Sequence, residues 1–214
     1  PGTKIEVEEI TKTLKQKSWN VVVYQQDQAN EEKVKNIKSP FVLHIATHGY
    51  FIEKTTENEQ QTRSLGVQNE RAVTNPLLRS GLLFAGADKT VLNINDRDNT
   101  EIDDGILNSF EAITLNLTNT HLVVLSACQT GLGEIQTGEG VYGLQRAFQI
   151  AGTKTIVTSL WPVSDEGTQL LMQEFYKNWL ESGDEFDAFH KSCIYIKNKL
   201  KYPFYWGAFV IIGK

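Results

Sequence analysis

The chain has 214 residues, of which 40% are hydrophobic, and its formal net charge at pH 7 is −5. This length and apolar content are enough to bury one sizeable core, which favours a single domain over residues 1–214. The acidic balance and the scattered lysines and arginines argue against nucleic acid as a direct partner, and no apolar run approaches the roughly 20 residues of a membrane helix, so no membrane partner is expected.

The first fifty residues predict helices and strands in alternation. Thr3 and Glu6 have capping-box spacing, and Val7 and Ile10 begin an apolar stripe at helical intervals, which predicts an amphipathic helix over residues 3–17. Three further elements are expected in order: a strand over residues 19–24, a short helix from Asn30 through Lys38, and an apolar strand over residues 41–49.

A hydrophilic stretch follows over residues 53–74, with no apolar side chain between Thr55 and Arg63. Loops of this length are uncommon inside a compact domain unless they are mobile or functional. A tolerated surface insertion and a substrate-gating or cleavable loop are equally good interpretations of it.

The rest of the chain continues the alternation of strands and helices. Up to Cys128, the expected elements are a short strand over residues 82–86, a second over residues 91–94, a helix from Asp103 to about Asn116, and an apolar strand ending at Cys128. After Cys128, they are a helix ending at Gly152, a strand over residues 155–160, a helix capped by Ser164 or Asp165, a helix carrying Phe186 to Ile196, and a strand over residues 208–212. This order indicates an α/β fold whose mostly parallel sheet is covered by helices on both faces.

Cys128 and His48 stand where chemistry is expected. Residues 122–125 are apolar β-formers that lead through small residues to Cys128, and the strand over residues 41–49 ends in His48 and Gly49. Ligands collect outside the carboxyl ends of strands in open α/β sheets. If the two strands are parallel neighbours, Cys128 and His48 lie at one edge of the sheet, which is the pairing that a cysteine nucleophile needs.

The other histidines and the second cysteine have structural interpretations. His44 shares a strand face with His48, but the two lie roughly 13 Å apart at about 3.3 Å per residue, so they cannot share a metal. His121 is interpreted as a polar residue at a strand entry, His190 as a helix-face residue, and Cys193 as a packed thiol. The cysteines fit no disulfide framework, which favours a cytoplasmic setting, and no cluster at ligand spacing predicts a metal or another cofactor.

A set of short motifs in chain order resembles the CHAT family, the caspase-like domains associated with tetratricopeptide repeats. The motifs are His48-Gly49, residues 126–131 (Ser-Ala-Cys-Gln-Thr-Gly), Gly138-Glu139-Gly140, Ala147-Phe148 with Ala151-Gly152, residues 159–163 (Ser-Leu-Trp-Pro-Val) with Asp165, and Tyr205-Trp206; residues 75–82 and 104–107 fit as well. The resemblance covers nearly the whole chain. It implies a caspase-like three-layer αβα sandwich with a mostly parallel central sheet, and a clan of cysteine peptidases.

The resemblance also implies roles for the residues at the sheet edge. Cys128 is expected to attack a peptide carbonyl, and His48 to help generate the thiolate or to protonate the leaving amine. The backbone N–H groups of Gly49 and Cys128 are implied as the oxyanion hole, consistent with close backbone approach at a glycine. The implied function is a cysteine endopeptidase that cuts a specific protein, in bacterial defence or cell death, after activation by an upstream domain, such as tetratricopeptide repeats, or by a partner.

Three residues are candidates for binding the substrate: Trp161, Asp165 and Glu139. Asp165 follows a strand end and would offer a carboxylate to the residue before the scissile bond, although a favourable charge in the first turn of a helix is the better interpretation. Trp161 either walls the substrate groove or packs. Glu139 and Glu134 are alternative pocket carboxylates.

Two other functions fit the same residues. A caspase-like fold can serve as a non-catalytic interaction module, and a Cys-His acyl or amide transferase also begins by acylating the thiol. We further expect the chain to be the C-terminal fragment of a longer protein, since it does not begin with Met. The resemblance implies that upstream sequence supplies a strand beside the histidine strand.

Overall fold

The structure is a computed structural model that describes residues 2–51, 76–88, 103–128, 139–161 and 164–213. Six strands form one sheet in the order β3-β2-β1-β4-β5-β6. They are β1 (Val42–Phe51), β2 (Ser80–Leu83), β3 (Ile106–Asn108), β4 (Leu122–Cys128), β5 (Thr155–Ser159) and β6 (Phe209–Gly213). The predicted loop over residues 53–74 and the predicted strand over residues 91–94 lie outside the described residues.

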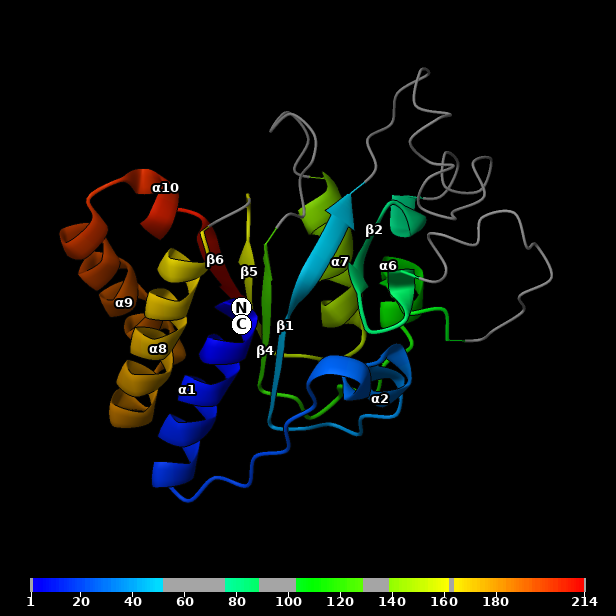
Figure 1. Cartoon of the computed structure of the whole chain (residues 1–214), viewed down its shortest axis with the longest axis horizontal. Helices are drawn as coiled ribbons and strands as arrows, with labels where there is room; N and C mark the ends of the chain where they lie inside the picture. Colours follow the sequence, from blue (N-terminus) through cyan, green and yellow to red (C-terminus); the bar gives the residue numbers. More distant parts are fainter. Residues whose placement is uncertain (1, 52–75, 89–102, 129–138, 162–163, 214) are drawn as a thin grey trace.

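The sheet is parallel at its centre and antiparallel at its edges. β1, β4 and β5 run parallel, whereas β2, β3 and β6 join the sheet in antiparallel pairs. A central strand covered on both faces needs apolar or small side chains along its whole length, and residues 122–127 of β4 are all buried. Helices lie on both faces of the sheet (Figure 1), which confirms the predicted α/β, caspase-like sandwich.

Three long helices cover one face of the sheet. They are α1 (Gly2–Gln16), α8 (Asp165–Ser182) and α9 (Glu185–Leu200). An apolar stripe on α8, from Leu171 to Trp179, packs against Leu122 and Val124 of β4. Ser164 is the N-cap of α8, since its side chain accepts a hydrogen bond from the Gly167 N–H. The short helix α10 (Pro203–Trp206) follows α9 before the chain enters β6.

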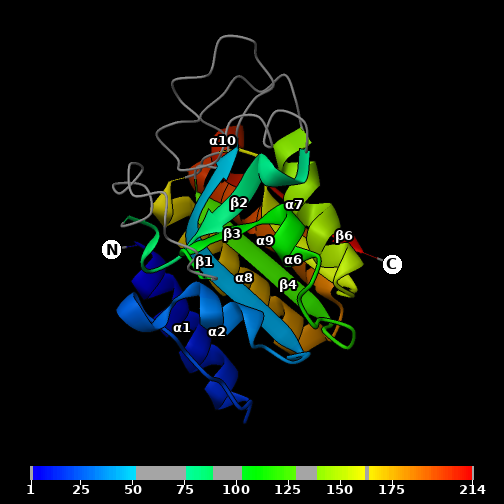
Figure 2. The same ribbon diagram turned by 90° about the vertical axis from the view of Figure 1, so that its right-hand side faces the viewer.

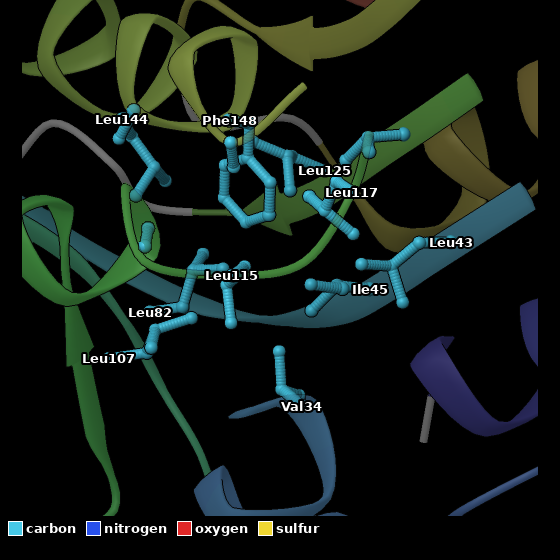
Figure 3. Close-up of a cluster of buried hydrophobic side chains, with 14 of the residues drawn as sticks. Val34, Leu43, Ile45, Leu82, Leu107, Leu115, Leu117, Leu125, Leu144 and Phe148 are labelled. Atoms are coloured by element: carbon cyan, nitrogen blue, oxygen red, sulfur yellow. The ribbon is translucent and has the colours of Figure 1, made fainter. Parts of the chain in front are cut away.

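Shorter helices cover the opposite face, which is turned toward the viewer in Figure 2. They are α2 (Glu31–Lys35), α6 (Ser109–Ala112) and α7 (Glu139–Ile150). Figure 3 shows Leu144 and Phe148 projecting from α7 into the apolar cluster, which Val34 of α2 enters near Ile45 of β1. Phe148 is fully buried. The predicted helix end at Gly152 is confirmed by its φ of +112°, which an L side chain rarely adopts.

The strand predicted over residues 19–24 is wrong. The segment is irregular and has no ladder partner among the described residues. Val22 is 68% exposed and Tyr24 is 45% exposed. Valine and tyrosine favour a strand only when neighbouring strands pair with it and cover it, so their β-propensity is not enough here.

The helix predicted from Asp103 to about Asn116 is also wrong over its first half. Residues 106–108 form β3, which pairs with β2, and the helix α6 begins only at Ser109. The Asn108 side chain accepts from the Glu111 N–H while the Glu111 carboxylate accepts from the Asn108 N–H, and this capping box sets the start of the helix. Phe110 of this helix is exposed.

Other boundaries move by a few residues. β2 begins at Ser80 rather than at residue 82, and α2 ends at Lys35 rather than at residue 38, with Asn30 as its predicted N-cap. In the part of the chain that the structure describes, no helix is long and apolar enough to span a membrane.

Candidate active site

His48 and Cys128 occupy matching positions on neighbouring strands. The register of the parallel pair β1–β4 aligns Val42 with Leu122 at one end and His48 with Cys128 at the other. Neighbouring strands lie roughly 4.8 Å apart, and residues in register on parallel strands share a face of the sheet. The main chain therefore brings the two predicted residues together at the carboxyl end of the parallel core, where the His48 side chain is exposed.

Gly49 lies one residue beyond the part of β1 that pairs with β4. It is buried and pairs with Leu82 of β2, because β1 continues to Phe51 as an antiparallel partner of that strand. Gly49 and Cys128, the two predicted oxyanion-hole positions, are thus diagonal neighbours across β1 and β4.

His44 has a structural environment, as predicted. Its Nε2 lies 3.0 Å from Oε1 of Glu6 on α1, and its Nδ1 lies 3.1 Å from the Tyr176 hydroxyl on α8. Glu6 and Tyr176 are buried. Burial, together with the negative charge of Glu6, raises the pKa of Tyr176, which therefore stays a neutral hydroxyl. Through these contacts, Glu6, His44 and Tyr176 join α1, β1 and α8 on the strand that also carries His48.

Trp161 lies two residues beyond β5, next to α10. Its indole Nε1 donates to the Phe204 carbonyl at 3.2 Å, and its ring lies 3.7 Å from the place that a Cβ on Gly207 would take. The β4–β5 register aligns Leu125 with Thr158, so counting on along it puts Trp161 level with Cys128. Trp161 is half-buried. It therefore packs against α10 at the same edge of the sheet as the candidate pair.

Asp165 and Glu139 both stand at helix starts. Asp165 is the exposed first residue of α8, next to the N-cap Ser164. A Cβ on Gly2 would lie 2.2 Å from Oδ2 of Asp165, so this carboxylate lies against the first turn of α1. Glu139 is the first residue of α7, and Glu134 lies outside the described residues. The contact of Asp165 with α1 was not predicted from the sequence.

The remaining histidines and the second cysteine lie elsewhere. At the amino end of β4, the Nε2 of His121 lies 3.1 Å from Oε1 of Glu185, and its ring stacks on Phe41 with centroids 5.0 Å apart. His190 is exposed on α9. Burial raises the pKa of the Cys193 thiol to about 11, so this thiol is protonated at neutral pH.

A cluster of charges around Lys35 was not predicted. Its Nζ lies 2.5 Å from Glu31, 3.2 Å from Asp103 and 3.1 Å from Glu111. Burial alone would lower the pKa of Lys35, but the hydrogen bonds and charges of Glu31 and Glu111 outweigh it and raise that pKa. Buried Glu31 also accepts from the Gly105 N–H at 2.8 Å. In the sequence, only the i,i+4 spacing of Glu31 and Lys35 could have indicated this charge cluster. Among the described residues, no group of three or more His, Cys, Asp or Glu is arranged to hold a metal ion.

A family model for the CHAT domain matches residues 1–214. The chain belongs to the CHAT domain family. Membership places it in the caspase-like clan, in agreement with the sandwich fold and with the motifs around His48 and Cys128.

Two curated relatives are similar to this CHAT domain over part of its length. They are the tetratricopeptide repeat protein 28 of Mus musculus, 27% identical over 110 residues, and that of Homo sapiens, 28% identical over 110 residues. Each match covers 50% of this chain and 4% of the relative. The chain thus corresponds to a small part of these much longer proteins.

Proposed function

We propose that this CHAT domain is a cysteine endopeptidase with a Cys128–His48 dyad. The supporting observation is the register of β1 and β4, which aligns His48 with Cys128 at the carboxyl end of their parallel pairing. A thiol needs a neighbouring base or cation to become a good nucleophile, and an imidazole one strand away meets that need. His48 is exposed, so a substrate can approach it from solvent.

The proposed reaction has two stages. The Cys128 Sγ, as a thiolate, attacks the carbonyl carbon of the scissile peptide, and the N–H groups of Gly49 and Cys128 stabilise the oxyanion. The C–N bond then breaks, and the leaving amine takes a proton from His48. A water molecule loses a proton to His48 as it attacks the thioester; the C–S bond breaks, the carboxylic acid leaves, and the Cys128 thiolate takes that proton back from His48.

Trp161 and Asp165 are the proposed substrate-binding residues on the β5 side of the dyad. Trp161 is anchored by its bond to the Phe204 carbonyl, and the Phe204 side chain beside it is 47% exposed. These rings offer an apolar wall to the substrate residues next to the scissile bond. Asp165 adds a negative charge at the start of α8, and Glu139 at the start of α7 is the alternative carboxylate.

The proposed setting is a longer cytoplasmic protein in which another domain controls the peptidase. Both curated relatives are named for tetratricopeptide repeats, which makes such a repeat domain the proposed regulatory partner. The proposed role is cleavage of a specific protein after activation, as in bacterial defence or programmed cell death.

Labelling with peptide electrophiles tests the dyad directly. A panel of peptidyl acyloxymethyl ketones is expected to add its mass to the peptide that contains Cys128 and not to the one that contains Cys193. His48→Ala is expected to slow this labelling by roughly a hundredfold or more, the usual share of a positioned base or acid. Proteome-wide profiling of new N-termini then identifies the cleaved protein.

Variants separate the peptidase from its alternatives. Cys128→Ala should abolish cleavage and keep the fold, and Cys193→Ala should cleave normally. Cleavage that persists in Cys128→Ala contradicts the proposal. An acylated Cys128 that transfers its acyl group to an amine, with no cut protein, identifies a transferase, and binding of a partner without any labelling identifies an interaction module.

A further inference from the structure

We infer that Ser159 is a positioning residue for Cys128, an inference that rests on the proposed peptidase function. Ser159 is the last residue of β5, and its hydroxyl donates to the carbonyl of Ala127, the residue directly before Cys128, at 3.0 Å. Both Ser159 and Ala127 are 2% exposed. The bond is therefore shielded from water, and no solvent molecule competes for this carbonyl.

The Ser159 hydroxyl links β4 and β5 at a point beyond the last pair of their main-chain ladder. The ladder between β4 and β5 ends at the pair Leu125–Thr158, three residues before Cys128. The next main-chain donor after Ser159, the Leu160 N–H, is bonded to the Ala208 carbonyl. A buried carbonyl without a donor is destabilising, so the Ser159 hydroxyl replaces the missing N–H and extends the link between the two strands toward Cys128.

The strand that carries His48 has a similar hydroxyl-to-carbonyl bond. The hydroxyl of Thr47, the residue before His48, donates to the carbonyl of Leu83 on β2. Each candidate catalytic residue thus directly follows a residue that a hydroxyl-to-carbonyl bond ties to its outer neighbouring strand. The β1–β4 register holds the two residues level, and the bonds from β5 and β2 hold the pair in place from both sides.

This arrangement predicts a loss of reactivity when the Ser159 hydroxyl is removed. Cys128 would then be held by its neighbour on β1 alone, and the thiol would sample positions away from His48. A displacement of about 1 Å at a reacting group lowers rates by as much as roughly a hundredfold. A purely structural role would lower stability and leave the reactivity of the folded protein unchanged.

The test is the pH profile of Cys128 alkylation by iodoacetamide, followed by peptide mass spectrometry on the folded protein with Cys193 as the internal reference. Ser159→Ala is expected to slow Cys128 alkylation roughly tenfold to a hundredfold near neutral pH and to shift its profile, whereas Ser159→Thr, which keeps a hydroxyl, stays close to the parent. Thr155→Ala is the matched control, because Thr155 is buried on the same strand and its hydroxyl bonds Glu185, away from Cys128.

A Ser159→Ala protein with a parental Cys128 profile overturns the inference, whatever its stability. If Ser159→Ala does not fold, Ser159→Val is compared with Ser159→Thr, because valine and threonine have the same shape and only threonine carries a hydroxyl. Equal Cys128 alkylation profiles for these two variants also overturn the inference. The His48→Ala variant distinguishes the positioning role of Ser159 from the proposed Cys128–His48 dyad. A profile that responds to Ser159→Ala and not to His48→Ala refutes the dyad and supports the positioning role, and the reverse refutes the positioning role alone.

Discussion

The surroundings of Cys193 predict how its thiol reacts. Burial raises the pKa of Cys193 to about 11, which leaves about one thousandth of it as thiolate at pH 8. Alkylation of Cys193 in the folded protein should therefore be slow at neutral pH and rise with each pH unit until about pH 11. Mass spectrometry after timed alkylation between pH 6 and pH 10 measures this. The urea-unfolded chain, in which Cys193 reacts as an ordinary thiol, is the control; fast reaction in the folded state at pH 7 contradicts the prediction.

At the scale of elements, Lys35 ties α2 to Glu111 of α6 and to Asp103 before β3, while Val34 is the buried aliphatic residue that packs α2 into the core. Lys35→Met should lower the free energy of unfolding by about 3 kcal/mol, the lower end of the cost of breaking a buried ion pair, because it leaves Glu31 buried without its cation. Lys33→Met, on the exposed side of the same helix, should change it by less than about 0.5 kcal/mol. Urea unfolding of both variants measures the difference, and equal midpoints refute the role of Lys35.

The sign of the pH dependence follows from the shifted pKa. Folding raises the pKa of Lys35 above its ordinary value of 10.5, so its contribution is fully present below that pH and is lost only as the pH rises further, toward the folded-state pKa. The stability difference between the parent and Lys35→Met should therefore be constant between pH 7 and pH 9. A difference that vanishes across this range would mean that Lys35 is not the cation that pairs with Glu31.

At the scale of the whole molecule, part of one edge of β1 has no partner strand among the described residues. β4 pairs with residues 42–48 on one edge, but β2 pairs only with residues 48–51 on the other, and no described residue forms a ladder with Val42–Ala46 there. Close by, Trp19 contacts the Phe41 ring, and the segment after it leaves Val22 exposed. An open edge beside exposed β-formers is a template for another strand.

We therefore predict that a strand from outside the described residues pairs with this edge of β1 when the domain is part of a longer protein. Amide hydrogen exchange should show Val42–Ala46 and residues 20–25 exchanging quickly in the isolated domain and slowly in the longer protein. The domain alone should also associate with itself and be poorly active. Equal exchange at these amides in both proteins, with full activity of the isolated domain, contradicts the prediction.

Much of this fold could be predicted from local patterns. The apolar runs of β4 and β5, the stripe of α8 and the caps at Asn30 and Ser164 are short-range features, because a residue's neighbours within four positions decide whether it faces a core or ends a helix. The same patterns located Cys128 at the end of β4 and His48 near the end of β1, which continues to Phe51, since an apolar run that stops at a polar residue marks the edge of a sheet.

Only the tertiary structure decided which segments pair. Residues 19–24 have the composition of a strand but lack a partner strand among the described residues. Ile106 was predicted to lie in a helix, yet it lies in β3, which pairs with β2. The alignment of His48 with Cys128 and the bond from Ser159 to Ala127 link residues 80 and 32 positions apart. Such contacts depend on register and on the path of the whole chain, which local propensity does not encode. The sequence by itself determined which residues are candidates for the chemistry, and the sheet determined that His48 and Cys128 lie in register on neighbouring strands.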